Sequence, residues 1–294
     1  MRSKRILIIP TLLAVLSLAC SFSIDLGQPT ETPGDPVATA VAATLAASGQ
    51  QSQPATEPPG QTPTLPIHPT VTASPEPDFS YQGVSFSYLE GLLNGATPDE
   101  IPAELQGPFA MPTHLRLDLE GYAVPGGDLG PVVKIYPTDD FRMVNASAGE
   151  QIDNLAALLE TKPADPESIP NPDLWGAAQF ISCQKAYVDF QNGSGVRYVT
   201  QWGQAAYPIG YPQMFYSFRG LTADGAYYVH VMLSVGHDAL PDASSVTMDD
   251  DFYNNYVTYA EEQEAFLESQ PPASFRPSLL VLDAFVQSIR VEGP

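Results

Sequence analysis

Short segments in which apolar and polar side chains alternate recur between residue 80 and the C-terminus. Residues 114–123 (HLRLDLEGYA) are the clearest, because three leucines alternate there with an arginine, an aspartate and a glutamate. Such alternation is typical of a β-strand with one buried face. Residues 80–89 (SYQGVSFSYL) and 131–137 (PVVKIYP) are predicted strands of the same kind, and residues 288–292 add a short strand at the end.

Two longer runs of aromatic and β-branched residues are each interrupted by a turn sequence. Asn192-Gly193 lies within residues 187–202, and residues 222–225 (TADG) interrupt residues 214–235. Because Asn and Gly adopt left-handed backbone conformations readily, both runs are predicted to fold as antiparallel β-hairpins.

Helices are predicted at three places. In residues 147–161, apolar side chains recur at helical spacing, and Ser147 and Glu150 have the spacing of a capping box. Residues 251–268 and 277–287 are the two further candidates. Hairpins combined with inserted and C-terminal helices indicate an α+β fold. We expect a single domain over residues 80–294, with a twisted antiparallel sheet and helices packed on one face.

The first nineteen residues have the pattern of a signal peptide. Three basic residues, Arg2, Lys4 and Arg5, precede fourteen uncharged residues that end at Ala19. A helix of that length spans roughly 21 Å, which is less than the ~30 Å hydrocarbon core of a bilayer. The segment therefore predicts secretion and not a membrane span.

A cysteine follows this apolar stretch directly, in the tripeptide Leu18-Ala19-Cys20. The tripeptide resembles the lipobox of bacterial lipoproteins, although Ser17 departs from it, since an aliphatic residue is usual at that position. The resemblance implies cleavage before Cys20 and attachment of a diacylglycerol to its thiol. It also implies an extracytoplasmic protein anchored to the cell membrane by this lipid. The alternative is an ordinary secretory signal that ends at a cysteine.

Residues 20–79 have the composition of a flexible tether. Eleven prolines lie between residues 28 and 79, and the only aromatic residues of the segment are Phe22 and Phe79. Such a segment cannot bury enough apolar surface to offset its chain entropy, so we predict disorder. At ~3.1 Å per extended residue, about fifty of these residues would reach on the order of 150 Å.

The sequence is strongly acidic, with 12 Lys and Arg against 34 Asp and Glu and a formal net charge of −22. Removal of the first nineteen residues takes away three basic side chains and no acidic one, which leaves −25. This charge argues against nucleic acid as a partner, because phosphates are bound by Lys and Arg. It also predicts repulsion from anionic headgroups, so membrane attachment would depend on the lipid at Cys20.

The histidines of the domain do not have the spacing of a metal site. They are His114, His230 and His237, the last of them followed by Asp238 and Asp242. We expect them to be structural.

Neither of two candidate nucleophiles has the context that catalysis needs. Ser194 stands between glycines, but in a predicted hairpin and not in the strand–turn–helix of a nucleophile elbow. Cys183 lies in an apolar run and is predicted to be a buried free thiol. The chain has no glycine-rich phosphate-binding motif, and we expect no cofactor and name no catalytic residue.

Three consecutive aspartates, Asp249, Asp250 and Asp251, stand at the start of the helix predicted at 251–268. Negative side chains complement the dipole at the N-terminus of a helix, which is the interpretation we favour. The alternative is a calcium site, because calcium prefers several carboxylate oxygens on one loop, although the D-x-D-x-D-G pattern is absent.

Aromatic residues are densest in residues 200–218 (TQWGQAAYPIGYPQMFYSF). Aromatic side chains with acidic neighbours suit the binding of carbohydrate or peptide. The alternative is that these rings fill the core face of the sheet. The candidate ligand surface consists of Trp202, Tyr207, Tyr211 and Tyr216.

Three segments of the domain, YQGVSFSYLEG, VDFQNGSGVRYVTQ and LLVLDAFVQSIRVE, resemble uncharacterised lipoproteins of environmental bacteria. This resemblance implies no activity. The residues favour a membrane-anchored lipoprotein that presents a binding domain, with carbohydrate, peptide or an envelope protein as partner. The alternatives are a hydrolase of cell-wall or extracellular polymer that uses a carboxylate pair, and a structural envelope protein without catalytic activity.

Overall fold

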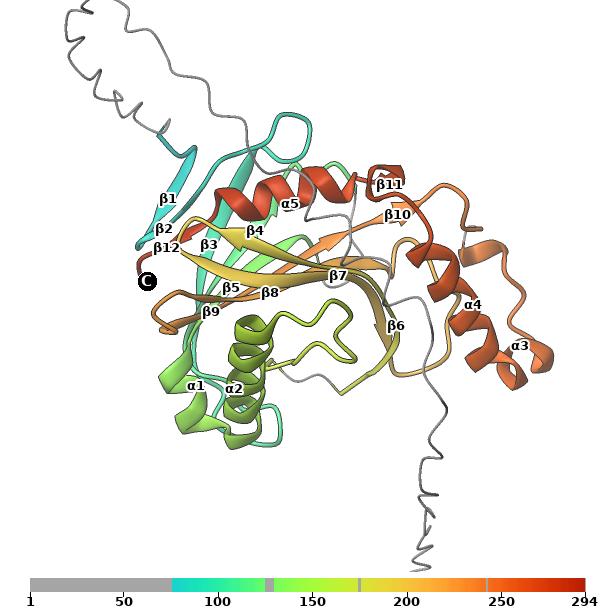
Figure 1. Ribbon diagram of the computed structural model, residues 1–294, viewed down its shortest axis with the longest axis horizontal. Helices are drawn as coiled ribbons and strands as arrows, with labels where there is room; N and C mark the ends of the chain where they lie inside the picture. The colour runs from blue at the N-terminus through green and yellow to red at the C-terminus, as the bar shows by residue number, and fades with distance from the viewer. Residues whose placement is uncertain (1–75, 125–129, 174–175, 242, 294) are drawn as a thin grey trace, which may run out of the picture. The chain divides into compact units, whose positions relative to one another are not determined.

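The computed structural model describes residues 76–124, 130–173, 176–241 and 243–293. Its largest element is a seven-stranded antiparallel sheet (Figure 1). The order of its strands is β3-β4-β5-β9-β8-β7-β6. The predicted α+β class and antiparallel sheet are confirmed. The strands are β3 (Gly95–Ile101), β4 (His114–Glu120), β5 (Val132–Pro137), β6 (Ala178–Phe190), β7 (Gly193–Gly203), β8 (Phe215–Thr222) and β9 (Tyr227–Ser234).

Helices cover both faces of this sheet and not one face as expected (Figure 1). Two helices pack against one face, and the C-terminal helix crosses the other, because apolar side chains of β5, β8 and β9 point to both sides. All residues of β8 are buried as a result. The helices are α1 (Thr138–Val144) and α2 (Ala146–Thr161) on the first face, and α4 (Tyr256–Glu268) and α5 (Leu279–Ser288) on the second.

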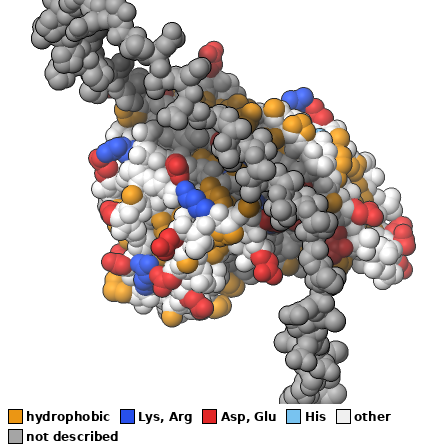
Figure 2. Space-filling view, in the orientation of Figure 1, with side chains coloured by type: hydrophobic (Ala, Val, Ile, Leu, Met, Phe, Trp, Pro, Cys, Tyr) orange, Lys and Arg blue, Asp and Glu red, His pale blue; other side chains and the backbone are white. Residues whose placement is uncertain are grey.

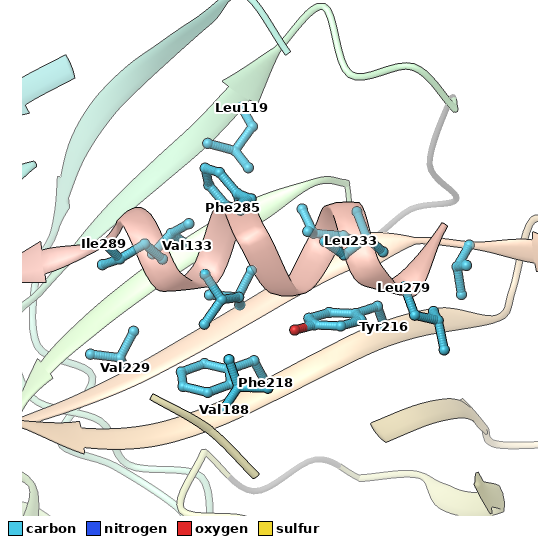
Figure 3. Close-up of a cluster of buried hydrophobic side chains, with 14 of the residues drawn as sticks. Leu119, Val133, Val188, Tyr216, Phe218, Val229, Leu233, Leu279, Phe285 and Ile289 are labelled. Atoms are coloured by element: carbon cyan, nitrogen blue, oxygen red, sulfur yellow. The ribbon is translucent and has the colours of Figure 1, made fainter. Parts of the chain in front are cut away.

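The larger core lies between α5 and the sheet, as Figure 3 shows. Phe285 and Leu279 of α5 face the side chains of Val133, Val229 and Leu233 on the strands below. Each of these side chains is fully buried, and burial of such a side chain contributes about 1.5–3 kcal/mol. The helix predicted at 277–287 is therefore a main element of the core.

Both predicted hairpins are present. Phe190 pairs with Gly193, so the two turn residues are Gln191 and Asn192, one position before the expected Asn192-Gly193 pair, and Gly193 opens β7 without a positive φ. The turn between β8 and β9 is closed by the carboxylate of Asp224, which accepts hydrogen bonds from the hydroxyl of Thr222 and the backbone N–H of Ala226. Local turn chemistry thus defines the register of four adjacent strands.

The prediction of one continuous strand at 80–89 is wrong. The segment turns back on itself and forms two short antiparallel strands, β1 (Phe79–Tyr81) and β2 (Val84–Phe86). Gly83 permits this turn with a φ of +75°, and a Cβ there would lie 2.2 Å from the carbonyl oxygen of Gly293. The predicted C-terminal strand, β12 (Arg290–Val291), pairs with β2.

Two helix starts differ from the prediction. Asn145, and not Ser147, caps α2, since its side-chain oxygen accepts the N–H of Ala148. The helix predicted at 251–268 is broken at Asn255 into α3 (Asp250–Asn254) and α4. The amide of Asn255 donates to the carbonyl of Asp251, a bond that competes with continuation of the helix.

The remaining elements are small. Strands β10 (Gly236–His237) and β11 (Phe275–Arg276) form a two-stranded sheet, and 3₁₀ turns span Ala243–Ser245 and Pro272–Ser274. The predicted signal peptide of residues 1–19, Cys20 and the predicted tether up to residue 75 lie outside the described residues, as does Asp242.

Candidate functional site

Large apolar side chains are exposed on the loop after β7 and on the first turns of α3 and α4. Tyr207 is 48 % exposed and Tyr211 42 % in the loop, and Tyr253 is 51 % and Val257 69 % exposed on the helices. We call these four residues the tyrosine platform. Single exposed apolar side chains are common, but several on segments that contact each other mark a candidate binding surface.

The two parts of the platform are joined by tyrosine hydroxyls. Tyr256 donates its hydroxyl to the carbonyl of Tyr207 at 2.9 Å, and Tyr259 accepts the N–H of Ile209 at 2.9 Å. Phe252 packs against both of these rings, with centroids 5.5 Å and 5.4 Å away. The backbone that carries the platform is therefore held in one arrangement.

Gln201 fixes the loop from the sheet side. Its amide donates to the carbonyl of Pro208 at 3.0 Å, and its oxygen accepts the N–H of Gly210 at 3.1 Å. Gln201 is buried at the end of β7, so these bonds are shielded from water. The loop is thus rigid before any ligand arrives.

Gln184 holds the C-terminal end of α4. It lies in a β-bulge of β6 and has a left-handed φ of +57°. Its side-chain amide donates to the carbonyls of Leu267, Glu268 and Gln270. Its own carbonyl accepts a hydrogen bond from Arg197. Gln184 was not among the predicted site residues, because its only distinguishing feature in the sequence is a polar side chain within a long strand pattern.

The surface around the platform is acidic. Residues 243–275 contain seven acidic side chains and no Lys, Arg or His. Acidic side chains gather in Figure 2 at the end of the domain where Figure 1 shows α3 and α4. Among the described residues, no basic nitrogen lies within 4.0 Å of these seven carboxylates.

The three consecutive aspartates do not converge on a metal site. Asp249 is the N-cap of α3 and accepts the N–H of Phe252 at 3.0 Å, as the cap interpretation predicted. Asp250 and Asp251 follow in the first turn of that helix. In the described part of the chain, no group of three His, Cys, Asp or Glu residues is arranged to hold a metal ion. The calcium alternative is therefore not supported.

Two residues of the predicted ligand surface are less exposed than Tyr207 and Tyr211. Tyr216 is fully buried beneath α5 (Figure 3), and its hydroxyl donates to Asp283 at 2.9 Å. Burial raises the pKa of Tyr216 well above its ordinary value, and the charge of Asp283 adds to this effect. Trp202 is partly buried against a small apolar cluster of β5, β8 and β9.

A buried chain of polar side chains lies on the opposite face of the sheet. Asp173 accepts from Nδ1 of His230 at 2.6 Å and from the hydroxyl of Tyr228 at 2.9 Å. Nε2 of His230 lies 3.3 Å from Oγ of Ser217. Burial raises the pKa of Asp173, but His230 and Arg219 outweigh burial and hold it below its ordinary value. Burial lowers the pKa of His230, and the charge of Asp173 and its hydrogen bond oppose this shift.

The hydrogen-bonded side chains of Ser217, His230 and Asp173 have the order of a Ser-His-Asp triad, yet a substrate could not reach them. Asp173, His230 and Ser217 are each at most 2 % exposed, and Ser217 lies in the middle of the sheet between β7 and β9. A guanidinium shares the site, since Arg219 donates to the carbonyl of Pro170 at 3.0 Å. We interpret these buried hydrogen bonds as structural, because they hold residues 170–173 against the sheet.

The other histidines have structural partners, as expected. His114 is buried, with Nδ1 3.0 Å from the carbonyl oxygen of Pro112 and its ring stacked on Tyr136 at 4.3 Å. Nε2 of His237 lies 3.0 Å from the hydroxyl of Ser274, and the following Asp238 pairs with Arg276. His237 and Asp238 therefore hold the β10–β11 region together.

The two candidate nucleophiles are also accounted for. Cys183 is a buried free thiol, as predicted, and burial raises its pKa above the ordinary value. Ser194 pairs with Asp189 and Leu221 at the end of the β6–β7 hairpin, as the hairpin interpretation requires.

Carboxylates also gather where α4 meets β6, around a cavity of about 420 Å³. Its lining includes Glu264, Glu268 and Asp165. Glu268 already accepts the backbone N–H of Gln184, and Nζ of Lys185 lies 3.6 Å from Asp165. These contacts indicate that the group fixes α4 on the bulged strand.

Comparison of the chain with protein-family models, with curated proteins and with solved structures finds no match. Among the described residues, no helix is long and apolar enough to cross a membrane.

Proposed function

We propose that this chain is an extracytoplasmic lipoprotein whose folded domain binds a ligand at the tyrosine platform. The observation that carries the proposal is the exposure of Tyr207, Tyr211, Tyr253 and Val257 beside a loop that is held by hydrogen bonds from Gln201, Tyr256 and Tyr259. Tyrosine is enriched among residues that dominate binding energy, because it offers a large, rigid contact area.

Rigidity favours binding for a second reason. Association costs free energy when loops and side chains must be ordered, and a preorganised loop avoids part of that cost. The loop of Tyr207 is ordered by Gln201 from below and by Tyr256 and Tyr259 from the side. The platform can therefore use most of its contact energy for affinity.

The N-terminal segments give this function its location. Lipid on Cys20 would hold the chain at the cell membrane, and the proline-rich tether would let the domain reach ligands away from the bilayer. Cys20→Ser tests the anchor: after cell fractionation, the variant is expected to leave the membrane fraction. Retention in the membrane with complete processing would contradict lipidation at Cys20.

Binding at the platform is tested with the purified full chain and a panel of probes. The panel contains chitohexaose, cellohexaose and twelve-residue peptides of neutral, basic and acidic composition. The platform variant is Tyr207→Ser with Tyr253→Ser, and its matched control is Leu105→Ser with Leu280→Ser, which changes two other exposed side chains.

At least one probe is expected to bind the wild type, and to bind the platform variant with an affinity at least tenfold lower. Such a change corresponds to a loss of about 1.4 kcal/mol of binding free energy. The control should bind like the wild type, and both variants should keep the wild-type melting temperature. If no probe separates the platform variant from the control, the proposed function is wrong.

A further inference from the structure

We infer that the ligand of the tyrosine platform is a polypeptide segment that carries Lys or Arg side chains. This inference rests on the proposed function and adds the chemical class of the partner. Its basis is the distribution of charge over the described residues, and not the aromatic side chains alone.

Basic side chains elsewhere in the domain already have acidic partners. Residues 80–294 contain nine Lys and Arg, and all nine lie among the described residues. Seven of them lie within 4.0 Å of a carboxylate oxygen, and the other two, Lys134 and Arg219, lie near Asp173 and lower its pKa. The domain therefore has no spare cation for the platform surface.

The carboxylates around the platform lack such partners. None of the acidic side chains of residues 249–268 is within 4.0 Å of a basic nitrogen of the described residues. Asp250, Glu261 and Glu262 are all exposed. A partner that supplies cations would neutralise this surface, whereas a neutral sugar would leave it unpaired.

Aromatic and acidic side chains also lie close enough together on the helices to contact the same Lys or Arg side chain of a ligand. Asp250 precedes Tyr253 by three residues, and Glu261 follows Val257 by four, the spacings of neighbours on a helix surface. A Lys or Arg side chain can lie over a tyrosine ring while its charged end meets a carboxylate. Its aliphatic stem would cover Val257.

The experiment must separate specific binding from general attraction, because the whole chain is acidic. The probe is a fluorescein-labelled (Gly-Lys)₆ peptide, compared with (Gly-Gln)₆ of the same length, in 0.15 M salt with the full chain. The acidic-surface variant is Asp250→Asn, Glu261→Gln and Glu262→Gln. The matched control removes three exposed, unpaired charges elsewhere: Glu150→Gln, Glu160→Gln and Glu167→Gln.

The (Gly-Lys)₆ peptide is expected to bind the wild type and the control alike. It should bind the acidic-surface variant about five- to tenfold more weakly, because each exposed ion pair contributes modestly. Equal affinity for that variant and the control would show general attraction and overturn the inference. Tyr207→Ser with Tyr253→Ser should weaken binding of the same peptide.

The two proposals fail in different ways. If chitohexaose or (Gly-Gln)₆ binds in a tyrosine-dependent manner and (Gly-Lys)₆ does not, the cationic partner is wrong and the binding function stands. If no probe depends on Tyr207 and Tyr253, the binding function itself is wrong.

Discussion

The buried carboxylate of Asp173 offers the strongest test of how this domain holds together. Asp173 is 2 % exposed and bonds to His230 and Tyr228, and its charge is balanced by the buried guanidinium of Arg219. Asp173→Asn keeps the shape and removes the charge, which leaves Arg219 without its counter-charge. Arg219 and Asp173 interact across more than 4.0 Å and do not form a direct salt bridge, yet removal of one of two buried opposite charges leaves the other uncompensated and costs up to about 3–5 kcal/mol.

A loss of this size is a large part of the stability of one domain, which is about 5–15 kcal/mol. It corresponds to a fall in melting temperature of roughly 6–20 °C for a domain of about 200 residues. Thermal and urea unfolding of the full chain at pH 7 measure it directly. Asp165→Asn is the control, because Asp165 is exposed and only loosely paired with Lys185, and it should unfold like the wild type.

A second variant keeps the test decisive even if Asp173→Asn does not fold. Arg219→Met in the Asp173→Asn background removes the unpaired cation, so the double variant should be more stable than Asp173→Asn alone. A loss below about 1 kcal/mol for Asp173→Asn, with no gain from Arg219→Met, would refute the ion-pair account.

Three further predictions follow from the same structure. Burial lowers the pKa of His114 and of His230, so the unfolded chain binds protons that the native state does not, and stability should decline as pH falls below about 6.5; a urea midpoint that is constant between pH 7 and 5 would contradict this. Gln184→Ala should cost about 2–3 kcal/mol in urea unfolding, since three backbone carbonyls lose a buried donor. Asp249→Ala should cost about 1 kcal/mol through loss of the helix cap, and a melting temperature that rises with calcium in the wild type alone would instead indicate a metal site.

Local patterns were sufficient to predict the elements whose structure depends on neighbouring residues. The turn sequences Asn192-Gly193 and residues 222–225 were sufficient to predict the β6–β7 and β8–β9 hairpins, although the β6–β7 turn lies one residue earlier than expected. Strand β3 was not predicted, since GATPDEI does not alternate and contains Pro98. Its position at the edge of the sheet explains why a proline is tolerated there.

The candidate site was predicted only in part, because exposure depends on contacts that are distant in sequence. Tyr207 and Tyr216 belong to one aromatic-rich segment, yet the first is exposed and the second is buried beneath α5. Alternation cannot separate them, since β8 is buried on both faces. Asp173 was missed because it lies in an irregular segment and meets His230 from 57 residues away.

The distribution of cations connects the core of this domain with its proposed surface function. Arg197 and Arg219 are buried on opposite faces of the sheet, and each is near a carboxylate from a covering segment, Asp283 for the first and Asp173 for the second. Six more cations form ion pairs with carboxylates that lie outside α3 and α4. Because the basic residues are used in this way, the acidic charge beside the tyrosine platform has no partner within the domain. The proposed cationic peptide would neutralise that charge while it covers the exposed tyrosines, so the aromatic and the acidic side chains support the same proposal.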